Sequence, residues 1–308
     1  MTSPAIWISA LLLASACGAP PHPGVPLRWD ATGHVVVPTS VDGSAPVDFI
    51  FDTGADDTVV FAWLATRLHL PAAGSGEVSG ATGSSDVALS RVASLAVDGH
   101  TIRDVTALTL PDRADAPQLG GVVGFDVMAG QLAVLDLGCG TAALVPVTSA
   151  PAVVGDRAQL VTAGGIPDGR QLTLPVTIDG VTGVAILDSG NRATIINTAF
   201  AVAAGRDPAS SAFHDTDPVR GASRQGVTAR VGVVGTVAFA GVVRRDATAR
   251  VADIPAFDGM GLSHVPAMLL GLDLLRGTRL SVDVSARRFW LAPSRCGATT
   301  RPASPPAS

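Results

Sequence analysis

Lysine and tyrosine are both absent from this chain of 308 residues. All 21 basic residues are therefore arginines; they are scattered along the chain, and the net charge is −5. Surfaces that bind nucleic acid need clustered basic residues, so this distribution indicates no nucleic-acid partner. The 6 histidines show neither the spacing of metal ligands nor a pairing with a nucleophile. The sequence therefore predicts no metal site and no cofactor.

Charged residues of both signs are also scarce, at 15% of the chain, whereas hydrophobic residues make up 47%. The chain contains 34 glycines and 22 prolines, and valine and threonine are abundant. Turn-forming residues combined with β-branched residues favour strands over helices. Because the length also allows two domains of ordinary size, we expect an all-β protein with two domains.

The apolar run at residues 5–16 is too short to cross a membrane. It ends in small residues before Cys17, which is typical of a signal peptide, here residues 1–17. Ala14–Cys17 resembles the bacterial lipobox, although alanine stands where leucine is usual and no basic residue precedes the apolar core. We therefore expect an exported protein, periplasmic, membrane-anchored or extracellular. Either a lipid on Cys17 tethers it to a membrane, or a plain secretory signal is removed.

The remaining cysteines and the chain ends also bear on export. Residues 18–27 are rich in proline and glycine and predict a tether, and residues 297–308 predict a disordered tail. Cys139 and Cys296 remain once the signal peptide is removed. In an oxidising compartment they either pair as a disulfide or stay separate thiols.

The rest of the chain falls into two halves, 28–150 and 151–296, in which the same order of elements occurs twice. Each half opens with an alternating run closed by Asp-Gly, which is typical of a β-hairpin. A return strand, a glycine-bearing hairpin, two β runs, an apolar-apolar-Gly segment with a brief helix, and a closing hairpin follow. The corresponding segments are 35–43 and 171–180, 47–51 and 184–187, 78–85 and 219–226, 87–110 and 227–251, 122–128 and 269–275, and 132–146 and 279–293. A duplicated β lobe explains this order, with 148–165 as the connection.

One short pattern occurs in both halves, at Phe51–Ala55 and Leu187–Asn191. In each copy an apolar strand leads into an aspartate, a hydroxyl residue and a glycine. Two carboxylates such as Asp52 and Asp188, brought face to face, share one proton and can activate a water. The glycine leaves room for a tight turn whose N–H groups face the carboxylate. Either tripeptide alone is a common turn; the two together, in aligned halves, predict a catalytic pair.

With these motifs in this order, the chain resembles the retropepsin-like and pepsin-like aspartic proteases, and in particular bacterial single-chain members with two lobes. The resemblance rests on Asp52–Val59, which is similar to the active-site stretch of retroviral proteases, and on the apolar-apolar-Gly motifs at 122–124 and 269–271. It implies a bilobal acid-protease fold and an aspartic endopeptidase that acts on peptides or proteins. We expect a monomer.

The resemblance also implies a role for each matching residue. The catalytic pair is Asp52 and Asp188, and its supports are Thr53, Gly54, Ser189, Gly190 and Asn191. The substrate-binding residues are Asp56, Asp57 and Arg192, together with Gly80, Ala81, Gly221 and Ala222 in two hairpins that act as flaps. Because Asp56 and Asp57 align with Arg192 and Ala193, the charge along the cleft is expected to be uneven, unless Arg192 is only a surface residue.

Asn191 departs from the family pattern, in which alanine, serine or threonine is usual. Its amide is expected either to donate to Asp188, which would lower the pKa of Asp188 and leave Asp52 as the proton holder, or to crowd the pair. The alternatives to a protease are a catalytically inactive relative that binds peptides or serves as a surface interaction module, and a purely structural lipoprotein. Carboxylates within hydrogen-bond reach under an open cleft favour the enzyme, and a filled cleft favours the structural protein.

Overall fold

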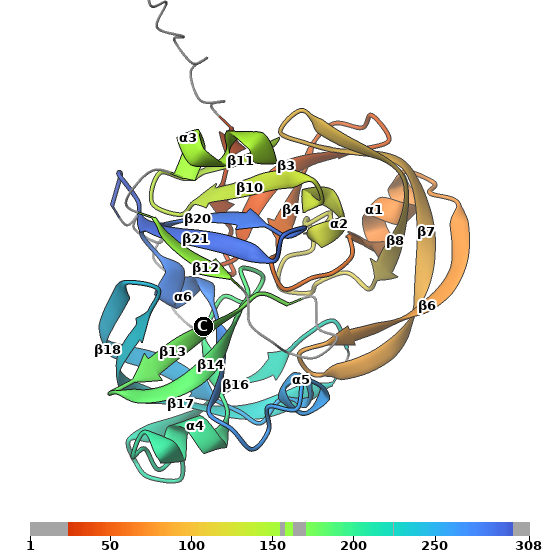
Figure 1. Ribbon diagram of the computed structural model, residues 1–308. Coiled ribbons are helices and arrows are strands. Elements are labelled where there is room, and N and C mark those ends of the chain that lie inside the picture. The colour runs from red at the N-terminus through yellow and green to blue at the C-terminus, as the bar shows by residue number, and fades with distance from the viewer. Residues whose placement is uncertain (1–23, 155–157, 163–170, 224, 298–308) are drawn as a thin grey trace, which may run out of the picture.

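Strands dominate the computed structural model, which describes residues 24–154, 158–162, 171–223 and 225–297 (Figure 1). The first half contains β1 (Val25–Pro26), β2 (Arg28–Trp29), β3 (Val35–Val41), β4 (Val47–Phe51), β5 (Val59–Phe61), α1 (Ala62–Arg67), β6 (Ala72–Gly80), β7 (Gly83–Val97), β8 (His100–Leu110), β9 (Gly121–Val123), α2 (Phe125–Met128), β10 (Gln131–Asp136) and β11 (Thr141–Pro146). A connection with a 3-10 turn (Val147–Ser149), α3 (Ala150–Val154) and β12 (Gln159–Thr162) follows. The second half contains β13 (Thr173–Ile178), β14 (Val181–Leu187), β15 (Ile195–Ile196), α4 (Thr198–Ala203), β16 (Phe213–Arg220), β17 (Gly226–Phe239), β18 (Val242–Val251), α5 (Pro255–Gly259), β19 (Ala267–Leu270), α6 (Leu272–Leu275), β20 (Thr278–Asp283) and β21 (Arg288–Pro293).

The two halves fold into lobes with the same strand order. The N-terminal lobe is an eight-stranded sheet with the order β2-β3-β4-β9-β5-β8-β7-β6. The C-terminal lobe is a seven-stranded sheet with the order β13-β14-β19-β15-β18-β17-β16. Apart from β2, each strand of the first sheet has a counterpart at the same place in the second. The predicted all-β fold with two duplicated lobes is therefore confirmed.

The strands that carry the two motifs lie inside their sheets. β4 pairs in parallel with β9 and antiparallel with β3, and β14 has the same relationship to β19 and β13. The last residues of each strand, Phe49–Phe51 and Ala185–Leu187, are buried. Strands that are apolar and paired on both sides form a rigid support. Each motif aspartate therefore begins its loop from a fixed position.

A third sheet joins the two lobes. Its order is β1-β11-β10-β20-β21-β12, so three strands come from the first half and three from the connection and the second half. In Figure 1, β10 lies beside β20, where the yellow-green and blue parts of the chain meet. The predicted closing hairpins are confirmed as β10–β11 and β20–β21. Their pairing with each other across the lobes was not predicted.

The predicted tether at residues 18–27 extends too far. Val25 and Pro26 pair with β11, and Leu27 is buried and donates its backbone N–H to Gly140. Residues 24–27 therefore belong to the shared sheet, because an apolar residue followed by a strand-compatible proline can fill a sheet edge. Residues 18–23, the predicted signal peptide with Cys17, and the predicted tail from residue 298 onward lie outside the described residues.

A disulfide closes the shared sheet at one end. Cys139, in the turn between β10 and β11, is bonded to Cys296, which follows β21, with Cα atoms 5.0 Å apart. This bond links the two halves, since the cysteines are 157 positions apart in sequence. Among the described residues, no helix has the length and apolarity required to cross a membrane.

Candidate active site

Asp52 and Asp188 meet where β4 and β14 end, and their carboxyl groups are hydrogen-bonded to each other. Each carboxylate is also held by its own loop. The backbone N–H of Gly54 donates to Oδ1 of Asp52 at 2.7 Å, and that of Gly190 donates to Oδ1 of Asp188 at 2.9 Å. The two loops thus present one pair of acids in symmetric surroundings.

The hydroxyl residues after the two aspartates lock the loops together. The backbone N–H of Thr53 donates to Oγ of Ser189, and the N–H of Ser189 donates to Oγ1 of Thr53, both at 3.0 Å. The Thr53 hydroxyl donates to the carbonyl of Leu187 at 3.3 Å, and the Ser189 hydroxyl to that of Phe51 at 2.8 Å. Thr53 and Ser189 are fully buried, so these four bonds across the lobes are shielded from water.

The two loop glycines leave the space that the carboxylates occupy. A Cβ atom on Gly190 would lie 2.1 Å from Oδ2 of Asp52, and one on Gly54 would lie 2.8 Å from Cγ of Asp188. Each carboxylate therefore packs on the backbone of the opposite loop. Any larger residue at these positions would push the two acids apart.

The surroundings of the pair favour retention of a proton. Burial raises the pKa of Asp52, against the opposing effect of the Gly54 N–H. Burial also raises the pKa of Asp188 well above its ordinary value, and the negative charge of Asp52 raises it further. Two carboxyls in contact at such a site cannot both be ionised easily, so the pair holds one shared proton over a wide pH range.

The side chain of Asn191 does not donate the hydrogen bond to Asp188 that the sequence predicted as one alternative. Its backbone N–H bonds to the carbonyl of Asp188, whereas Nδ2 of its amide is buried and has no hydrogen-bond partner among the described residues. The amide therefore does not lower the pKa of Asp188. The pKa of Asp188 is instead raised, by burial and by the charge of Asp52, so the predicted division of the proton has no support from this side chain.

A second pair of acids fixes the segments behind the loops. Asp126 accepts hydrogen bonds from the N–H and hydroxyl of Thr58 at 3.1 and 2.9 Å. Asp273 accepts from the N–H of Thr194 at 2.9 Å and from its hydroxyl at 2.7 Å. Both carboxylates also accept from the next residue of their short helices. The sequence predicted only a brief helix in each of these segments. The pairing of the acids with threonines 68 and 79 positions earlier could be recognised only from the fold.

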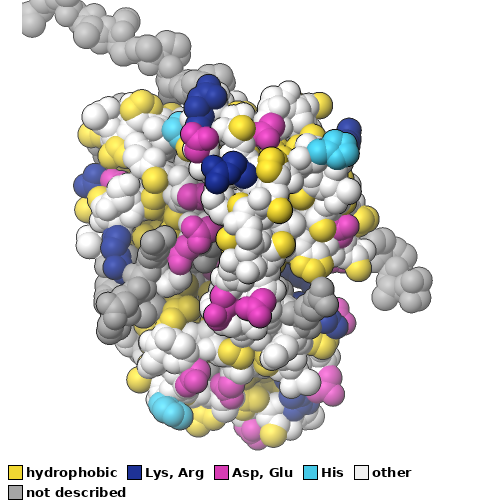
Figure 2. All heavy atoms as spheres, turned by 90° about the vertical axis from the view of Figure 1, so that its right-hand side faces the viewer, with side chains coloured by type: hydrophobic (Ala, Val, Ile, Leu, Met, Phe, Trp, Pro, Cys, Tyr) yellow, Lys and Arg dark blue, Asp and Glu magenta, His cyan; other side chains and the backbone are white. Residues whose placement is uncertain are grey.

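The hairpins β6–β7 and β16–β17 meet at their tips, in keeping with their expected role as flaps. Oγ1 of Thr82 lies 2.8 Å from Oγ of Ser223, and the N–H of Gly221 donates to Thr82 at 3.1 Å. Thr82 is fully buried although it is in a turn. Figure 2 looks onto the side of the molecule where β6 and β7 lie, and acidic side chains gather along the middle of this face.

Each flap tip reaches across to the apolar residues of the other lobe. Ala81 packs against a cluster that contains Ile186, two residues before Asp188. Ala222 packs against a cluster that contains Ile50, two residues before Asp52. The flaps therefore cross beside the pair, and the predicted flap residues Gly80, Ala81, Gly221 and Ala222 all lie at this crossing.

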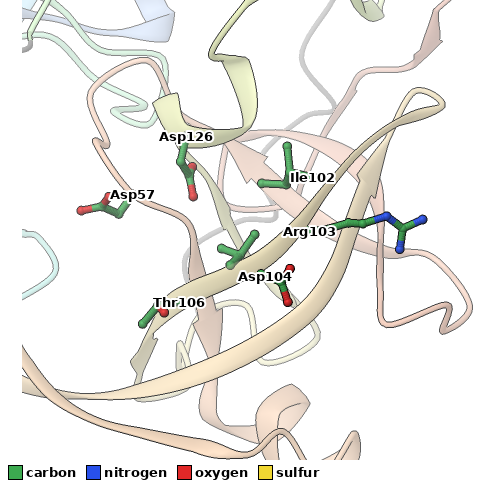
Figure 3. A pocket seen from close by; sticks show the side chains of 7 residues that line it. Asp57, Ile102, Arg103, Asp104, Thr106 and Asp126 are labelled. Carbon is green, nitrogen blue, oxygen red and sulfur yellow. The ribbon is translucent and has the colours of Figure 1, made fainter.

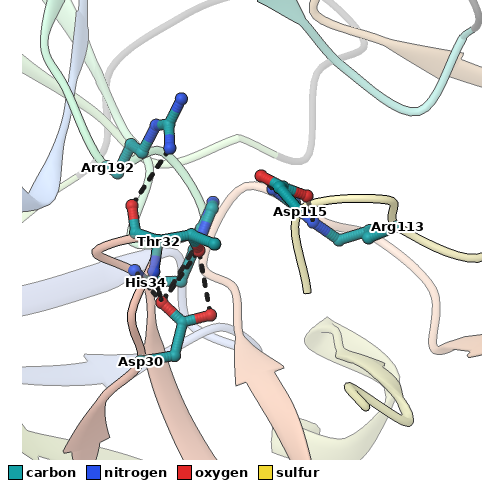
Figure 4. A network of polar contacts seen from close by, with 6 residues as sticks. All are labelled: Asp30, Thr32, His34, Arg113, Asp115 and Arg192. Carbon is teal, nitrogen blue, oxygen red and sulfur yellow. Dashed lines mark hydrogen bonds and ion pairs between the residues drawn. The ribbon is translucent and has the colours of Figure 1, made fainter. Parts of the chain in front are cut away.

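Beyond the pair, the structure places Asp57 and Arg192 in different surroundings. Asp57 is exposed and borders a cavity of about 340 Å³ whose other acidic residues are Asp104 and Asp126 (Figure 3). Arg192 reaches the other lobe, where Nη1 donates to the carbonyl of Thr32 at 3.1 Å. Figure 4 shows Arg192 above a polar network that the sequence did not predict; it consists of Asp30, Thr32, His34, Arg113 and Asp115.

The described residues contain no group of three or more histidine, cysteine, aspartate or glutamate side chains placed to hold a metal ion. The chain matches no curated protein. A family model described as aspartyl protease matches residues 37–127 and 174–274, one region in each lobe. Because these regions make up more than half of the chain and each contains one motif aspartate, the protein belongs to the aspartyl protease family.

Proposed function

We propose that this protein is an aspartic endopeptidase in which Asp52 and Asp188 activate a water molecule against a peptide carbonyl. The observation that carries the proposal is the hydrogen bond between the two carboxyl groups, each held by the N–H of a glycine two residues on. Such a pair contains a base and an acid at the same time, which hydrolysis of an unactivated amide requires.

The surroundings of each carboxyl suggest the order of proton transfers. Asp52 is the ionised partner and takes a proton from water, and the water oxygen bonds to the carbonyl carbon. Asp188, whose pKa is raised by burial and by the negative charge of Asp52, gives its proton to the carbonyl oxygen. When the tetrahedral intermediate collapses, the carbon–nitrogen bond breaks and the leaving nitrogen receives from Asp52 the proton that came from water. One hydroxyl group of the intermediate returns its proton to Asp188 as the new carboxyl group forms. One shared proton is again present at the end of the cycle.

Export to an oxidising compartment belongs to the same proposal. The apolar run at residues 5–16 supports it, as does the disulfide between Cys139 and Cys296, because structural disulfides persist mainly outside the cytosol. Lipidation of Cys17 stays a prediction from the sequence. A mass measurement of the mature N-terminus distinguishes a lipidated Cys17 from a plain secretory cleavage.

The test is cleavage of a diverse peptide library by the purified protein between pH 3 and 8, with and without a pepstatin-like inhibitor. Asp52→Asn and Asp188→Asn are expected to lower kcat/KM by about 10³-fold or more, since each removes one partner of the acid–base pair. Both should still fold, because asparagine keeps the shape and acceptor oxygen of aspartate. If the wild type binds peptides but cleaves none at any pH, the protein is an inactive, peptide-binding relative.

A further inference from the structure

The pseudo-symmetry of the two loops places an acid and a base at equivalent positions. The backbone N–H of Phe125 donates to the carbonyl of Ala55 at 2.9 Å, and that of Leu272 donates to the carbonyl of Asn191 at 2.8 Å. Ala55 and Asn191 are therefore structural equivalents. The next residue is Asp56 in the N-terminal lobe and Arg192 in the C-terminal lobe, so one position of the twofold arrangement carries opposite charges.

Arg192 has donor capacity left for a ligand. One guanidinium nitrogen donates to the carbonyl of Thr32, and Figure 4 shows another nitrogen pointing away from that contact. Arg192 forms no ion pair with the part of the chain that the structure describes. The neighbouring Arg113 is already paired with Asp115 at 2.8 Å. A half-buried guanidinium with one nitrogen fixed by the protein suits a carboxylate, because its geometry is set before binding.

The loop beneath Arg192 is rigid. The carboxylate of Asp30 accepts the backbone N–H groups of Thr32 and His34 at 3.0 and 2.9 Å, and the Thr32 hydroxyl lies 2.6 Å from Nδ1 of His34. These bonds fix the Thr32 carbonyl that holds Arg192. Asp30 is engaged by this loop, and Asp115 forms its ion pair with Arg113. Arg192 acts on Asp115 only as a more distant charge, which helps to lower the pKa of that acid after the larger effect of Arg113.

The equivalent flank of the N-terminal lobe is acidic. Asp57 is exposed, and in Figure 3 its carboxylate points away from Asp126 and out of the cavity. Its charge contributes to the raised pKa of Asp126, after the larger effect of burial, which shows that the acids of this flank act on one another. Arg103 points away from the cavity in the same view. An acidic ligand group would therefore be repelled here and attracted at Arg192.

We propose that Arg192 is a specificity-determining residue, which selects substrates with an acidic side chain or terminal carboxylate on one side of the scissile bond. The inference rests on the proposed protease activity and names its substrate class. Asp56 and Asp57 disfavour the same group on the other side and favour a basic residue there. The charge of the substrate thus sets the direction in which a peptide lies across the pseudo-symmetric pair.

The test uses one cleavable peptide in which glutamate, glutamine or arginine is placed in turn at each of four positions on either side of the bond. For the wild type, the ratio of kcat/KM for glutamate over glutamine should reach about 10-fold at one position on one side, and fall below 1 on the other. Arg192→Gln, which can still donate to Thr32, should bring the glutamate-over-glutamine ratio close to 1 at every position. Arg192→Lys should keep part of the glutamate preference, and Arg192→Glu should replace it by a preference for arginine. The exposed Arg245→Gln should leave all these ratios unchanged.

Several outcomes overturn the proposal. A glutamate ratio near 1 at all positions for an active wild type refutes charge selection while leaving the protease function intact. An equal fall for every peptide in Arg192→Gln shows that Arg192 has only a structural role. If no peptide is cleaved, the protease function fails, and the same labelled peptides are then measured for binding to the full-length protein. A missing glutamate preference in those dissociation constants also rejects the role of Arg192.

Discussion

The side chain of Thr53 accepts the backbone N–H of Ser189, and the side chain of Ser189 accepts the backbone N–H of Thr53. These two reciprocal bonds join the lobes directly behind the carboxyl pair. Because both residues are fully buried, neither N–H could find water as a substitute partner. The spacing of Asp52 and Asp188 therefore depends on two hydroxyl groups that take no part in chemistry.

Removal of either hydroxyl should destabilise the protein and slow cleavage. Thr53→Val and Ser189→Ala each leave a buried N–H unsatisfied, so we expect a loss of about 1–3 kcal/mol in the free energy of unfolding. The double variant should lose less than the sum, since the two residues share one network. Urea unfolding measures these values. Ser79→Ala, which removes one partner of an exposed hydroxyl pair, is the control and should cost less than about 0.5 kcal/mol.

Gly190→Ala should greatly slow peptide cleavage while the protein still folds. The added Cβ would lie 2.1 Å from Asp52 Oδ2, so the carboxyl group must move and the pair separates. We expect a fall in kcat/KM of about 10²-fold or more, because misplacement by about 1 Å has this effect on catalysis. Gly259→Ala is the matched control, since a Cβ atom on Gly259 would have no neighbouring atom within 4 Å. Wild-type activity in Gly190→Ala would mean that the pair tolerates a wider separation.

His34 should make the protein less stable as the pH falls. Burial, reinforced by Arg113, lowers the pKa of His34 from 6.5 to about 4. Between pH 6.5 and about 4 the unfolded chain binds a proton at His34 and the folded protein does not, so the free energy of unfolding falls over this range. It does not change further below about pH 4. The loss is about 3 kcal/mol. Solvent screens this effect little, because the exposed fraction of His34 is only 5%.

The variant His34→Gln removes this titration. Urea unfolding between pH 4 and 7 should show a slope with pH that is smaller for His34→Gln than for the wild type, whatever the absolute stability of the variant. The exposed His214→Gln serves as the control and should keep the wild-type slope. Equal slopes in all three proteins would place the acid sensitivity elsewhere.

The disulfide should contribute to stability by restricting the unfolded chain. Cys139 and Cys296 enclose the whole second half, and loops of this length are associated with about 2–5 kcal/mol. Reduction should therefore lower the Tm of the wild type. The double variant Cys139→Ser/Cys296→Ser should unfold at the lower temperature with or without reductant. A Tm that reductant leaves unchanged in the wild type would show that the bond adds nothing.

The duplication, the strand order and the meeting of the two motifs could be predicted because each rests on local patterns that occur twice. Alternation, Asp-Gly turns and apolar-apolar-Gly segments define both lobes without knowledge of the partner. The shared sheet could not be predicted in this way, because nothing in the local pattern of β10 specifies that β20 is its neighbour.

The same limit applies at the site. The environment of Asn191 depends on how its amide is directed, which tertiary packing decides. The polar network around His34 is assembled from segments far apart in the sequence, and the crossing of the flap tips joins residues of both lobes. Reasoning about single residues therefore predicted the uneven charge of the two loops, but not that the amide of Asn191 lacks a hydrogen-bond partner.

The pairing of β10 with β20 has the geometry of a symmetric dimer interface inside one chain. Ala133 lies opposite Val282, Leu135 lies opposite Leu280, and Val134 lies opposite its own counterpart, Ser281. Such a contact is isologous, which means that both strands form it with equivalent residues. A lobe expressed alone would expose this edge and would pair with a second copy of itself. The fused chain can vary its two loops independently, whereas a dimer of identical lobes would have to carry the same charge on both sides.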